Sequence, residues 1–240
     1  MRTLRRIAVA GALALAVPAA AHAAVVVPPT SVVLSDEQTT TRWANPYEKA
    51  PVREAPSPRS RAIGRLHLWT EDGFPEVYLV LRRYQDASGR DWLLIRLPMR
   101  PNGRNGWVPE ESLSRLGFTR LHLVVDRHRL VATLYRGGRR VWSSRIGVGK
   151  ASTPTPGGRF WIREKFSTGN PGGFYGPWAM GTSAYSNLSD WPGGGVVGIH
   201  GTSQPYLIPG RPSHGCIRMP NGAITRLVRL MGVGTPVWIV

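Results

Sequence analysis

The chain has 240 residues and a single cysteine, Cys216. A single cysteine cannot form an internal disulfide, which excludes the disulfide framework common in small secreted proteins. Its thiol is therefore either an idle buried side chain or a group retained for its reactivity. The residues around Cys216 decide between these two interpretations.

Acidic residues are also scarce: 14 Asp and Glu stand against 31 Lys and Arg, a formal net charge of +17. Such a charge bears on partners and not on the fold, and it favours anionic partners such as wall polymers and lipid head groups. The basic residues are spread along the chain and form no block. The arginine usage of a GC-rich genome is therefore an equally good explanation.

The sequence lacks a hydrophobic run that would span a membrane comfortably. The apolar segment 7–21 is shorter than the roughly 20 residues that a spanning helix needs. It follows the basic start MRTLRR and precedes small residues at Ala21 and Ala23, the order found in secretory signal peptides. We therefore predict a signal peptide over 1–23 and a protein exported to the cell wall or periplasm, with no stable membrane anchor after cleavage.

Export has consequences for the charge and for the thiol. Cleavage after Ala23 leaves 28 basic and 14 acidic residues, a net charge of +14, and no cysteine at the cut that could carry a lipid. Export argues against nucleic acid as a partner and leaves anionic cell-wall polymers. An unpaired thiol outside the cell is open to oxidation, so Cys216 needs a reason to be retained.

The composition divides the remaining chain into three parts. Residues 24–50 are rich in Pro, Thr and small residues without sustained periodicity, and we predict a linker there. Residues 51–116 contain the β-rich runs VYLVLRRYQ and WLLIRLP around the turn sequence DASGR. Over VREAPSPRSRAIGRL and WLLIRLPMRPNGRNGWVPEESL they resemble bacterial Src-homology-3-like domains, which implies a small barrel. The alternative is an unrelated β-rich packing domain.

Residues 120–240 form the third part. LHLVVDRHRLVATLY predicts two joined strands, and VWSSRIGVG, GRFWIREKF, VVGIHGT and TPVWIV predict further strands. NGAITRLVRLMG predicts a short helix capped by Asn221 and ended by Gly232. We expect a mainly β chain, with the small barrel followed by a mixed β-sandwich or barrel that has one short helix after the cysteine. The apolar face of that helix would consist of Ile224, Leu227, Val228 and Met231.

Reactive side chains gather in two short stretches, GIHGT and SHGCIRM. A thiol reacts as a thiolate, and a neighbouring imidazole or helix N-terminal amides favour that form. Cys216 has His214 close beside it, His200 upstream and the predicted helix downstream. Gly215 lets the backbone approach a substrate, and the Gly215 and Cys216 amides are candidates for an oxyanion hole.

A metal site is the alternative use of the same side chains. His200, His214 and Cys216 all belong to residue types that bind zinc. No second cysteine and no HxxxH pair completes a set of ligands. We therefore expect no metal.

GIHGT followed by SHGCIRM resembles the signature of the L,D-transpeptidase (YkuD-type) catalytic domain. The resemblance runs from about Leu121 to Val240 and includes GVGKASTPTPGGRF and the closing GTPVWIV. It implies that Cys216 is the nucleophile and that His200 is the general base, oriented by the backbone carbonyl of Gly201. Gly201 also counts among the substrate-binding residues that the resemblance implies.

The resemblance also implies roles for five neighbours. His214 and Gly215 would shape the oxyanion hole together with the amide of the cysteine. Ser213 and Arg218 would order the loop and help to receive the peptide carboxylate. Tyr175, in GGFYGPWAM, would face the site from a lid region.

The reaction that the resemblance implies is acyl transfer between peptidoglycan stem peptides. The thiolate attacks the bond between diaminopimelate and the terminal D-Ala of a tetrapeptide stem, and D-Ala leaves. The amine of a second stem then resolves the thioester into a 3→3 cross-link. No metal or organic cofactor is needed, and carbapenems are expected to acylate the same thiol.

Several alternatives stay open. Water at the thioester would make an L,D-carboxypeptidase, and a free D-amino acid would make an exchange enzyme. A non-catalytic wall-binding protein with a degenerate catalytic domain is another, although the intact GIHGT and SHGCIRM stretches argue against degeneration. A papain-type peptidase would place its cysteine before its histidine, the reverse of His200 and Cys216.

Overall fold

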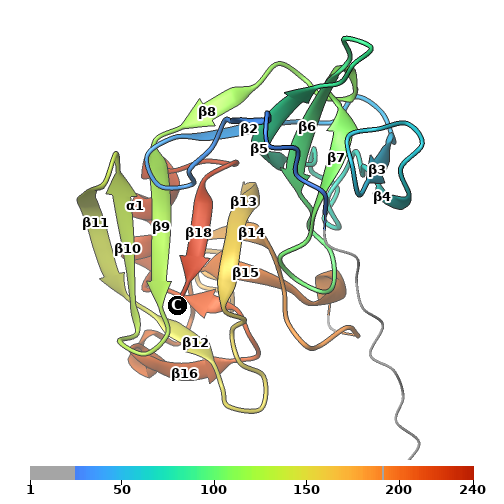
Figure 1. The fold of residues 1–240 in the computed structure, drawn as a ribbon. Helices are drawn as coiled ribbons and strands as arrows, with labels where there is room; N and C mark the ends of the chain where they lie inside the picture. The colour runs from blue at the N-terminus through green and yellow to red at the C-terminus, as the bar shows by residue number, and fades with distance from the viewer. Residues whose placement is uncertain (1–24, 191) are drawn as a thin grey trace, which may run out of the picture.

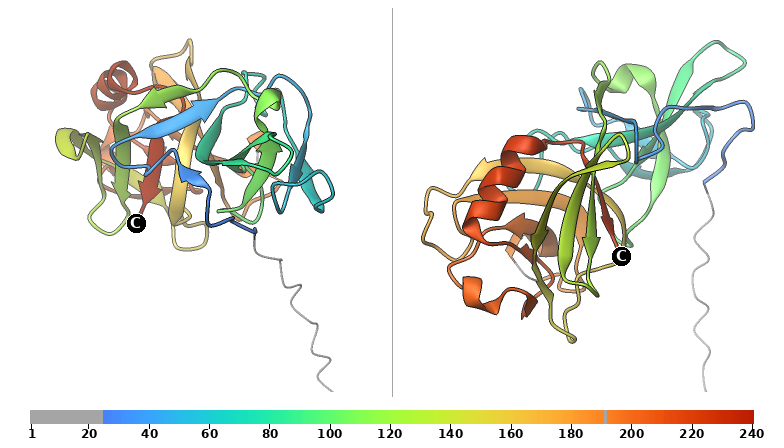
Figure 2. Two further views of the ribbon diagram at one scale, coloured as in Figure 1. Left: turned by 45° about the horizontal axis from the view of Figure 1, so that its top comes forward. Right: turned by 90° about the vertical axis from the view of Figure 1, so that its left-hand side faces the viewer.

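The computed structural model describes residues 25–190 and 192–240 (Figure 1). The signal peptide predicted for 1–23 lies outside the described residues. The described chain is mainly β-strand, with one α-helix and two curled sheets (Figures 1 and 2). The expected fold class, mainly β with one short helix after the cysteine, is confirmed.

The first sheet has the strand order β4-β3-β7-β6-β5-β2-β8, and β1 pairs with β5. The predicted turn DASGR joins β5 to β6, and there the Asp86 carboxylate accepts hydrogen bonds from the Ser88 and Arg90 amides at 2.9 and 3.1 Å. The core of this sheet includes Val52, Val80, Leu93, Ile95 and Val108. The elements are β1 (Val32–Val33), β2 (Thr41–Ala44), β3 (Pro51–Arg53), β4 (Ala62–Arg65), β5 (Tyr78–Gln85), β6 (Asp91–Arg96), β7 (Asn105–Pro109), the 3-10 helix η1 (Glu110–Ser112) and β8 (Gly117–Thr119).

The segment 24–50, predicted as a linker, contains two strands that belong to the first sheet. β2 pairs with β5 through Arg42 and Val80, and with β8 through Thr41 and Thr119, while β1 pairs with β5. β2 has only four residues, and its partners lie far along the chain. No local pattern therefore marks it as a strand.

Residues 51–116 all belong to the first sheet and its connections. The sheet extends beyond the predicted boundaries, because β2 precedes them and β8 follows them. The resemblance to a Src-homology-3-like barrel stays a prediction.

The second sheet has the order β11-β10-β9-β18-β13-β14-β15-β17-β12-β16. The long strand β13 joins its two halves, because its beginning pairs with β18 and its end pairs with β14. The strands are β9 (Leu121–Asp126), β10 (Val131–Arg136), β11 (Arg139–Arg145), β12 (Gly147–Gly149), β13 (Gly158–Ser167), β14 (Trp178–Tyr185), β15 (Val196–His200), β16 (Gly210–Ser213), β17 (Ile217–Arg218) and β18 (Pro236–Ile239), with 3-10 helices η2 (Pro192–Gly195) and η3 (Pro205–Leu207).

Strand β14 was not expected from the sequence. WAMGTSAY consists largely of small residues without apolar alternation, and its six central residues are all buried. A strand covered on both faces has no period-2 pattern, so the usual signal of alternation is missing.

The helix α1 (Asn221–Leu230) forms as predicted, but its cap does not. Pro220 occupies the N-cap position, and Asn221 is the first helical residue, with no side-chain cap hydrogen bond. The predicted apolar face is buried, and it consists of Ile224, Leu227 and Val228, followed by Met231 just after the last helical residue.

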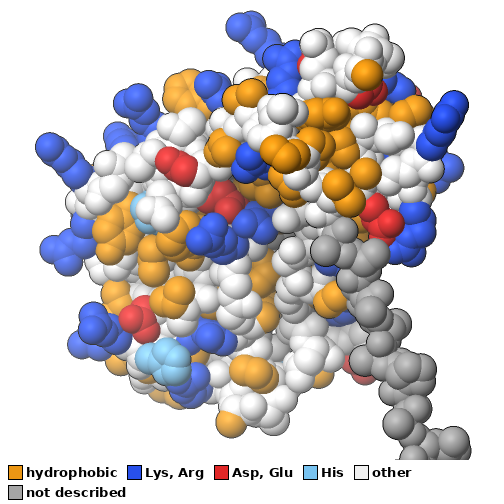
Figure 3. Space-filling model, in the orientation of Figure 1, with side chains coloured by type: hydrophobic (Ala, Val, Ile, Leu, Met, Phe, Trp, Pro, Cys, Tyr) orange, Lys and Arg blue, Asp and Glu red, His pale blue; other side chains and the backbone are white. Residues whose placement is uncertain are grey.

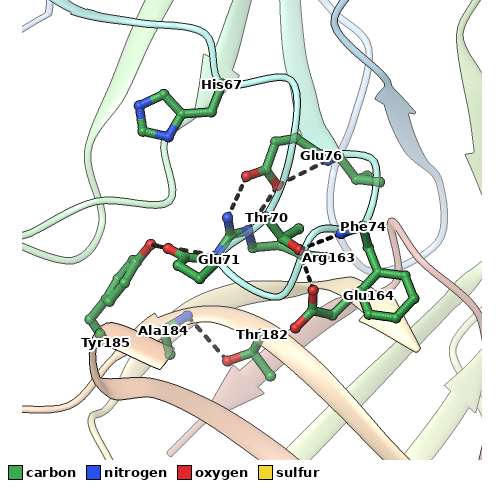
Figure 4. Close-up of polar contacts among 12 residues, drawn as sticks. His67, Thr70, Glu71, Phe74, Glu76, Arg163, Glu164, Thr182, Ala184 and Tyr185 are labelled. Carbon is green, nitrogen blue, oxygen red and sulfur yellow. Dashed lines mark hydrogen bonds and ion pairs between the residues drawn. The ribbon is translucent and has the colours of Figure 1, made fainter. Parts of the chain in front are cut away.

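Buried polar contacts join the two sheets. The indole N–H of Trp161, on β13, donates a 2.7 Å hydrogen bond to the carbonyl of Val77. Its neighbour Arg163 lies between Glu76 and Glu71 of the first sheet (Figure 4). The first sheet is therefore packed against β13 and is not joined to the second sheet by the connecting chain alone.

The surface agrees with the composition. Lys and Arg side chains are scattered over the face drawn in Figure 3 and do not form one patch. None of the helices in the described part of the chain is both long enough and apolar enough to cross a membrane.

Candidate active site

Parallel strands β15 and β17 place the two predicted stretches side by side. Ile199 pairs with Ile217, and His200 pairs with Arg218. Both isoleucines are completely buried in the core. Because successive side chains alternate between the faces of a strand, His200 and Arg218 lie on the opposite face, together with Cys216. His200 and Cys216 both line a cleft of about 480 Å³ on that face.

Gly198 lies between the thiol and the imidazole. Its N–H donates a hydrogen bond to Sγ of Cys216 at 3.4 Å. A Cβ atom on Gly198 would lie 3.8 Å from both Sγ of Cys216 and Cδ2 of His200. The glycine thus keeps the space between the thiol and the imidazole open. We did not single out this residue from the sequence, and the only available signal was its place at the start of GIHGT.

The imidazole of His200 is buried and fixed in orientation. Its Nδ1 lies 2.6 Å from the carbonyl oxygen of Gly201, so Nδ1 carries the proton and Nε2 is left as an acceptor. Burial, assisted by the positive charge of Arg218, lowers the pKa of His200 to about 4. The ring is therefore neutral near pH 7 and ready to accept a proton.

The thiol of Cys216 is held in its neutral form. Burial raises its pKa above the ordinary value, and the Gly198 amide and Arg218 only partly oppose this effect. The helix amides expected to stabilise a thiolate are not its partner, since α1 begins at Asn221 and the hydrogen bond to sulfur comes from Gly198. The resting pair is a thiol and a neutral imidazole.

The turn before the cysteine is tied by Ser213. Its hydroxyl donates a 2.6 Å hydrogen bond to the Cys216 carbonyl and accepts one of 3.2 Å from the Gly215 amide. Thr155 donates to the Gly215 carbonyl at 2.7 Å. The Gly215 amide, predicted to face a developing oxyanion, is thus committed to Ser213. Its φ of 127° explains why glycine occupies this position.

His214 and Tyr175 have different partners near the thiol. The His214 side chain is exposed, and its Nε2 lies 3.1 Å from Nζ of Lys150. The ring of Tyr175 meets the ring of His200 edge to face, with centroids 4.7 Å apart. Tyr175 is 46% exposed and forms part of the rim of the cleft next to His200.

Arg218 supplies a buried positive charge to the site. It is 5% exposed, its guanidinium lies 4.4 Å from the ring centre of Phe174, and its Nη1 donates to Gln204 at 3.2 Å. Its Nε is buried and has no hydrogen-bond partner among the described residues. An anionic substrate group that reached this nitrogen would satisfy it.

Asn221 joins the segments that frame the site, which explains why it is not free to cap the helix. Its Oδ1 accepts a 2.8 Å hydrogen bond from the Thr202 amide, and its Nδ2 donates to the Pro171 carbonyl at 3.2 Å. Gly201 packs closely against this amide and Gly176. Gly201, predicted as a substrate-binding residue, therefore has two structural roles. Its carbonyl orients His200, and its lack of a side chain leaves room for the Asn221 amide.

The structure brings seven of the eight predicted residues to one cleft and its rim, and the eighth, Gly201, accepts the hydrogen bond of the His200 ring. Among the described residues, no group of three or more His, Cys, Asp or Glu side chains could hold a metal ion. The eight residues are Cys216, His200, His214, Gly215, Ser213, Arg218, Gly201 and Tyr175.

Comparison with known proteins gives consistent matches for the second half of the chain. Residues 120–239 match the family model of the YkuD L,D-transpeptidase catalytic domain. A Bacillus subtilis protein named as an L,D-transpeptidase, YkuD, is 34% identical over 118 residues, which is 49% of this chain and 65% of that protein. The chain thus spans slightly less than two thirds of that relative.

Solved structures of L,D-transpeptidases also resemble this chain. The catalytic domain of an Enterococcus faecium L,D-transpeptidase is 25% identical, and the match covers 50% of this chain and 95% of that one, with a TM-score of 0.37. An L,D-transpeptidase from Mycobacterium smegmatis is 15% identical, with 68% and 90% of the chains covered and a TM-score of 0.41.

Proposed function

The chain belongs to the YkuD family of L,D-transpeptidase catalytic domains, and we propose that it is a peptidoglycan L,D-transpeptidase that works through Cys216. The observation that supports this most strongly is the arrangement of Cys216 and His200 around Gly198. The thiol and a neutral imidazole share one open cleft, and the imidazole is held by Gly201 with Nε2 as acceptor.

In the first step, Sγ of Cys216 attacks the carbonyl carbon between diaminopimelate and the terminal D-Ala of a tetrapeptide stem. Because the free thiol is protonated and the imidazole of His200 is neutral, the proton moves to Nε2 as the C–S bond forms. His200 then passes this proton to the departing D-Ala amine, and the thioester remains.

In the second step, the amine of another stem attacks the thioester carbon. His200 takes a proton from this amine, and Cys216 leaves with a proton as the 3→3 cross-link forms. The Cys216 amide is the proposed oxyanion donor, with the turn at His214 setting its direction, because the Gly215 amide is engaged by Ser213.

Arg218 is proposed to bind the carboxylate of the terminal D-Ala. Its buried Nε offers a charged donor with no partner among the described residues, at the rim that Phe174 and Tyr175 share. A carboxylate there would form a charge-assisted hydrogen bond in a partly desolvated site. Tyr175 would then cover the bound stem.

Export, the cell wall as site of action, and acylation of Cys216 by carbapenems belong to the same proposal. The basic surface suits anionic wall polymers. A β-lactam carbonyl presents the thiol with an acyl centre comparable to the proposed peptide bond.

The deciding experiment incubates the protein and its Cys216→Ala variant with purified disaccharide-tetrapeptide and weighs the products. A dimer equal to two monomers minus one D-Ala, absent with the variant, supports transpeptidation. A shortened tripeptide monomer alone makes the enzyme an L,D-carboxypeptidase, and incorporation of an added D-amino acid makes it an exchange enzyme. No change with either protein leaves the wall-binding alternative.

A further inference from the structure

The cleft does not end at the catalytic pair, because it continues to the first sheet. Cys216 and His200 lie at one end, and Asp72 and Phe74, from the loop 69–76 of the first sheet, line the other. None of the described residues that line this cavity is Lys or Arg, although the chain has 31 of them. The positive charges of this strongly basic protein are therefore absent from the lining of this cavity.

Two glycines form the floor between the two ends. Glu164 pairs with Gly181 across β13 and β14, and Gly181 pairs with Gly198 across β14 and β15. The Gly198 amide in turn donates to the Cys216 thiol. The Glu164 carboxylate lies directly over Gly181, where a Cβ atom would collide with it. Two strand spacings, about 10 Å, therefore separate this carboxylate from the strand of the thiol.

The walls of the far end are apolar and aromatic. The rings of Phe74 and Phe166 stack with centroids 5.2 Å apart, one from each sheet (Phe74 in Figure 4). Such faces pack well against methylene groups. The end itself is acidic: the Glu164 carboxylate accepts a hydrogen bond from Thr70 (Figure 4). It also interacts with Asp72, which lines the same cavity.

The acidic end is not neutralised from within the protein. Arg163 adjoins Glu164 in the chain, but its guanidinium is bound by Glu76 and Glu71, with Nε of Arg163 2.8 Å from Oε1 of Glu76. Burial, together with the charge of Asp72, raises the pKa of Glu164 to about 7. Glu164 thus retains a proton near neutrality, and a bound cation would replace this proton.

We propose that this cavity receives the amine-bearing side chain of the diamino acid in the donor stem, with Asp72 and Glu164 binding its ammonium group and Phe74 and Phe166 packing against its methylene groups. This inference rests on the proposed function and adds a specificity determinant contributed by the first sheet. The amine of diaminopimelate lies about 7 Å from the attacked carbonyl carbon in an extended side chain, given C–C bonds of about 1.5 Å. Together with a hydrogen bond of about 3 Å from the ammonium group to the carboxylate, this span matches the roughly 10 Å between the strand of the thiol and the Glu164 carboxylate.

The test measures binding separately from turnover. Calorimetry on the Cys216→Ala protein compares a tetrapeptide stem containing diaminopimelate with the same peptide acetylated on its free side-chain amine. We expect the free amine to bind at least tenfold more tightly. Adding Asp72→Asn, or Asp72→Asn with Glu164→Gln, should reduce that preference to less than threefold. Glu111→Gln, which removes the same charge from an exposed ion pair with Arg90 outside the cavity lining, is the matched control and should keep the preference.

Equal binding of the two peptides overturns the inference. A preference for the free amine that persists in the Asp72 and Glu164 variants also overturns it, because such a preference would arise from the size of the acetyl group and not from charge. Asp72 is exposed, so its variant is not expected to unfold the protein. Turnover of the unmodified stem by the native protein separates the two proposals. Cross-linking without any amine preference overturns this inference alone, whereas amine preference without turnover overturns the proposed function and leaves the cation site standing.

Discussion

Arg163 and Glu76 form an ion pair that is shielded from water although the two residues belong to different sheets. Arg163 is 2% exposed, Glu76 is completely buried, and Nε of Arg163 lies 2.8 Å from Oε1 of Glu76. A buried charge pair holds only while both partners stay in place. The two sheets are therefore expected to unfold as one unit.

Replacing Glu76 with Ala should lower the free energy of unfolding by about 3–5 kcal/mol, because it leaves the buried guanidinium of Arg163 without its main partner. Urea titration followed by tryptophan fluorescence measures the change. Asp91→Ala is the control, since it removes a partner of Arg83 from an exposed pair and should cost less than about 1 kcal/mol. Equal losses in the two variants would contradict a special role for the buried pair.

The alkylation rate of Cys216 should report the resting state of the site. Burial raises the pKa of the thiol above its ordinary value, so the thiolate fraction and the rate of reaction with iodoacetamide should rise about tenfold per pH unit between pH 6 and 8. Because Cys216 is the only cysteine, the label is unambiguous, and Cys216→Ser gives the blank. A rate independent of pH between 6 and 8 would instead indicate a thiolate–imidazolium pair.

Substitution of His200 by Gln should reduce kcat/KM by about 10² to 10⁴ if this residue is the general base. His214→Gln is the matched control and should cost less than tenfold, because the side chain is exposed and lies next to Lys150. The reverse order of the two effects would transfer the role of base to His214. Since burial lowers the pKa of His200 to about 4, activity should be lost only as pH falls through about 4.

Gly198→Ala should impair catalysis without unfolding the protein. The added Cβ would lie at ordinary contact distance, 3.8 Å, from Cys216 Sγ and from His200, so the fold tolerates it. It would nevertheless fill the space through which a substrate approaches both groups, and we expect kcat/KM to fall at least tenfold with Tm changed by only a few degrees. Unchanged kcat/KM would mean that substrates approach from another side.

Glu164 should make stability depend on pH. Its pKa is raised in the folded protein from 4.5 to about 7, chiefly by burial, so the folded state holds a proton that the unfolded chain releases. This contribution is fully present below pH 4.5 and is lost as pH rises through 7. Thermal unfolding at several pH values should therefore show the Tm of the native protein falling relative to Glu164→Gln between pH 5 and 8. Parallel curves would contradict the raised pKa.

Local patterns in the sequence were sufficient for part of this structure. Alternation predicted β9 and β10, and the 3.6-residue period predicted the buried face of α1. The stretches GIHGT and SHGCIRM indicated both members of the thiol–imidazole pair, because their residue types carry the proposed chemistry themselves.

Features that depend on contacts between distant segments could not be predicted in this way. β2 is recognisable only through its pairing with β5 and β8, and Asp72 meets Glu164 only because the two sheets pack together. The direction of the Gly215 amide likewise depends on a hydroxyl two residues away, which no periodicity reports. Tertiary contacts decide each of these features.

The loop 69–76 has a consequence for how such proteins diversify. It belongs to the first sheet, yet it walls the cavity that adjoins Cys216, and Glu76 of the same loop anchors Arg163 of the second sheet. The two halves therefore cannot be exchanged freely by recombination. A first sheet from another protein would leave the buried guanidinium of Arg163 without Glu76, and the cavity without Asp72 and Phe74. We therefore expect the two halves to be inherited together. A chimera would need the loop 69–76 and the residues of the second sheet that contact it to be transferred at once.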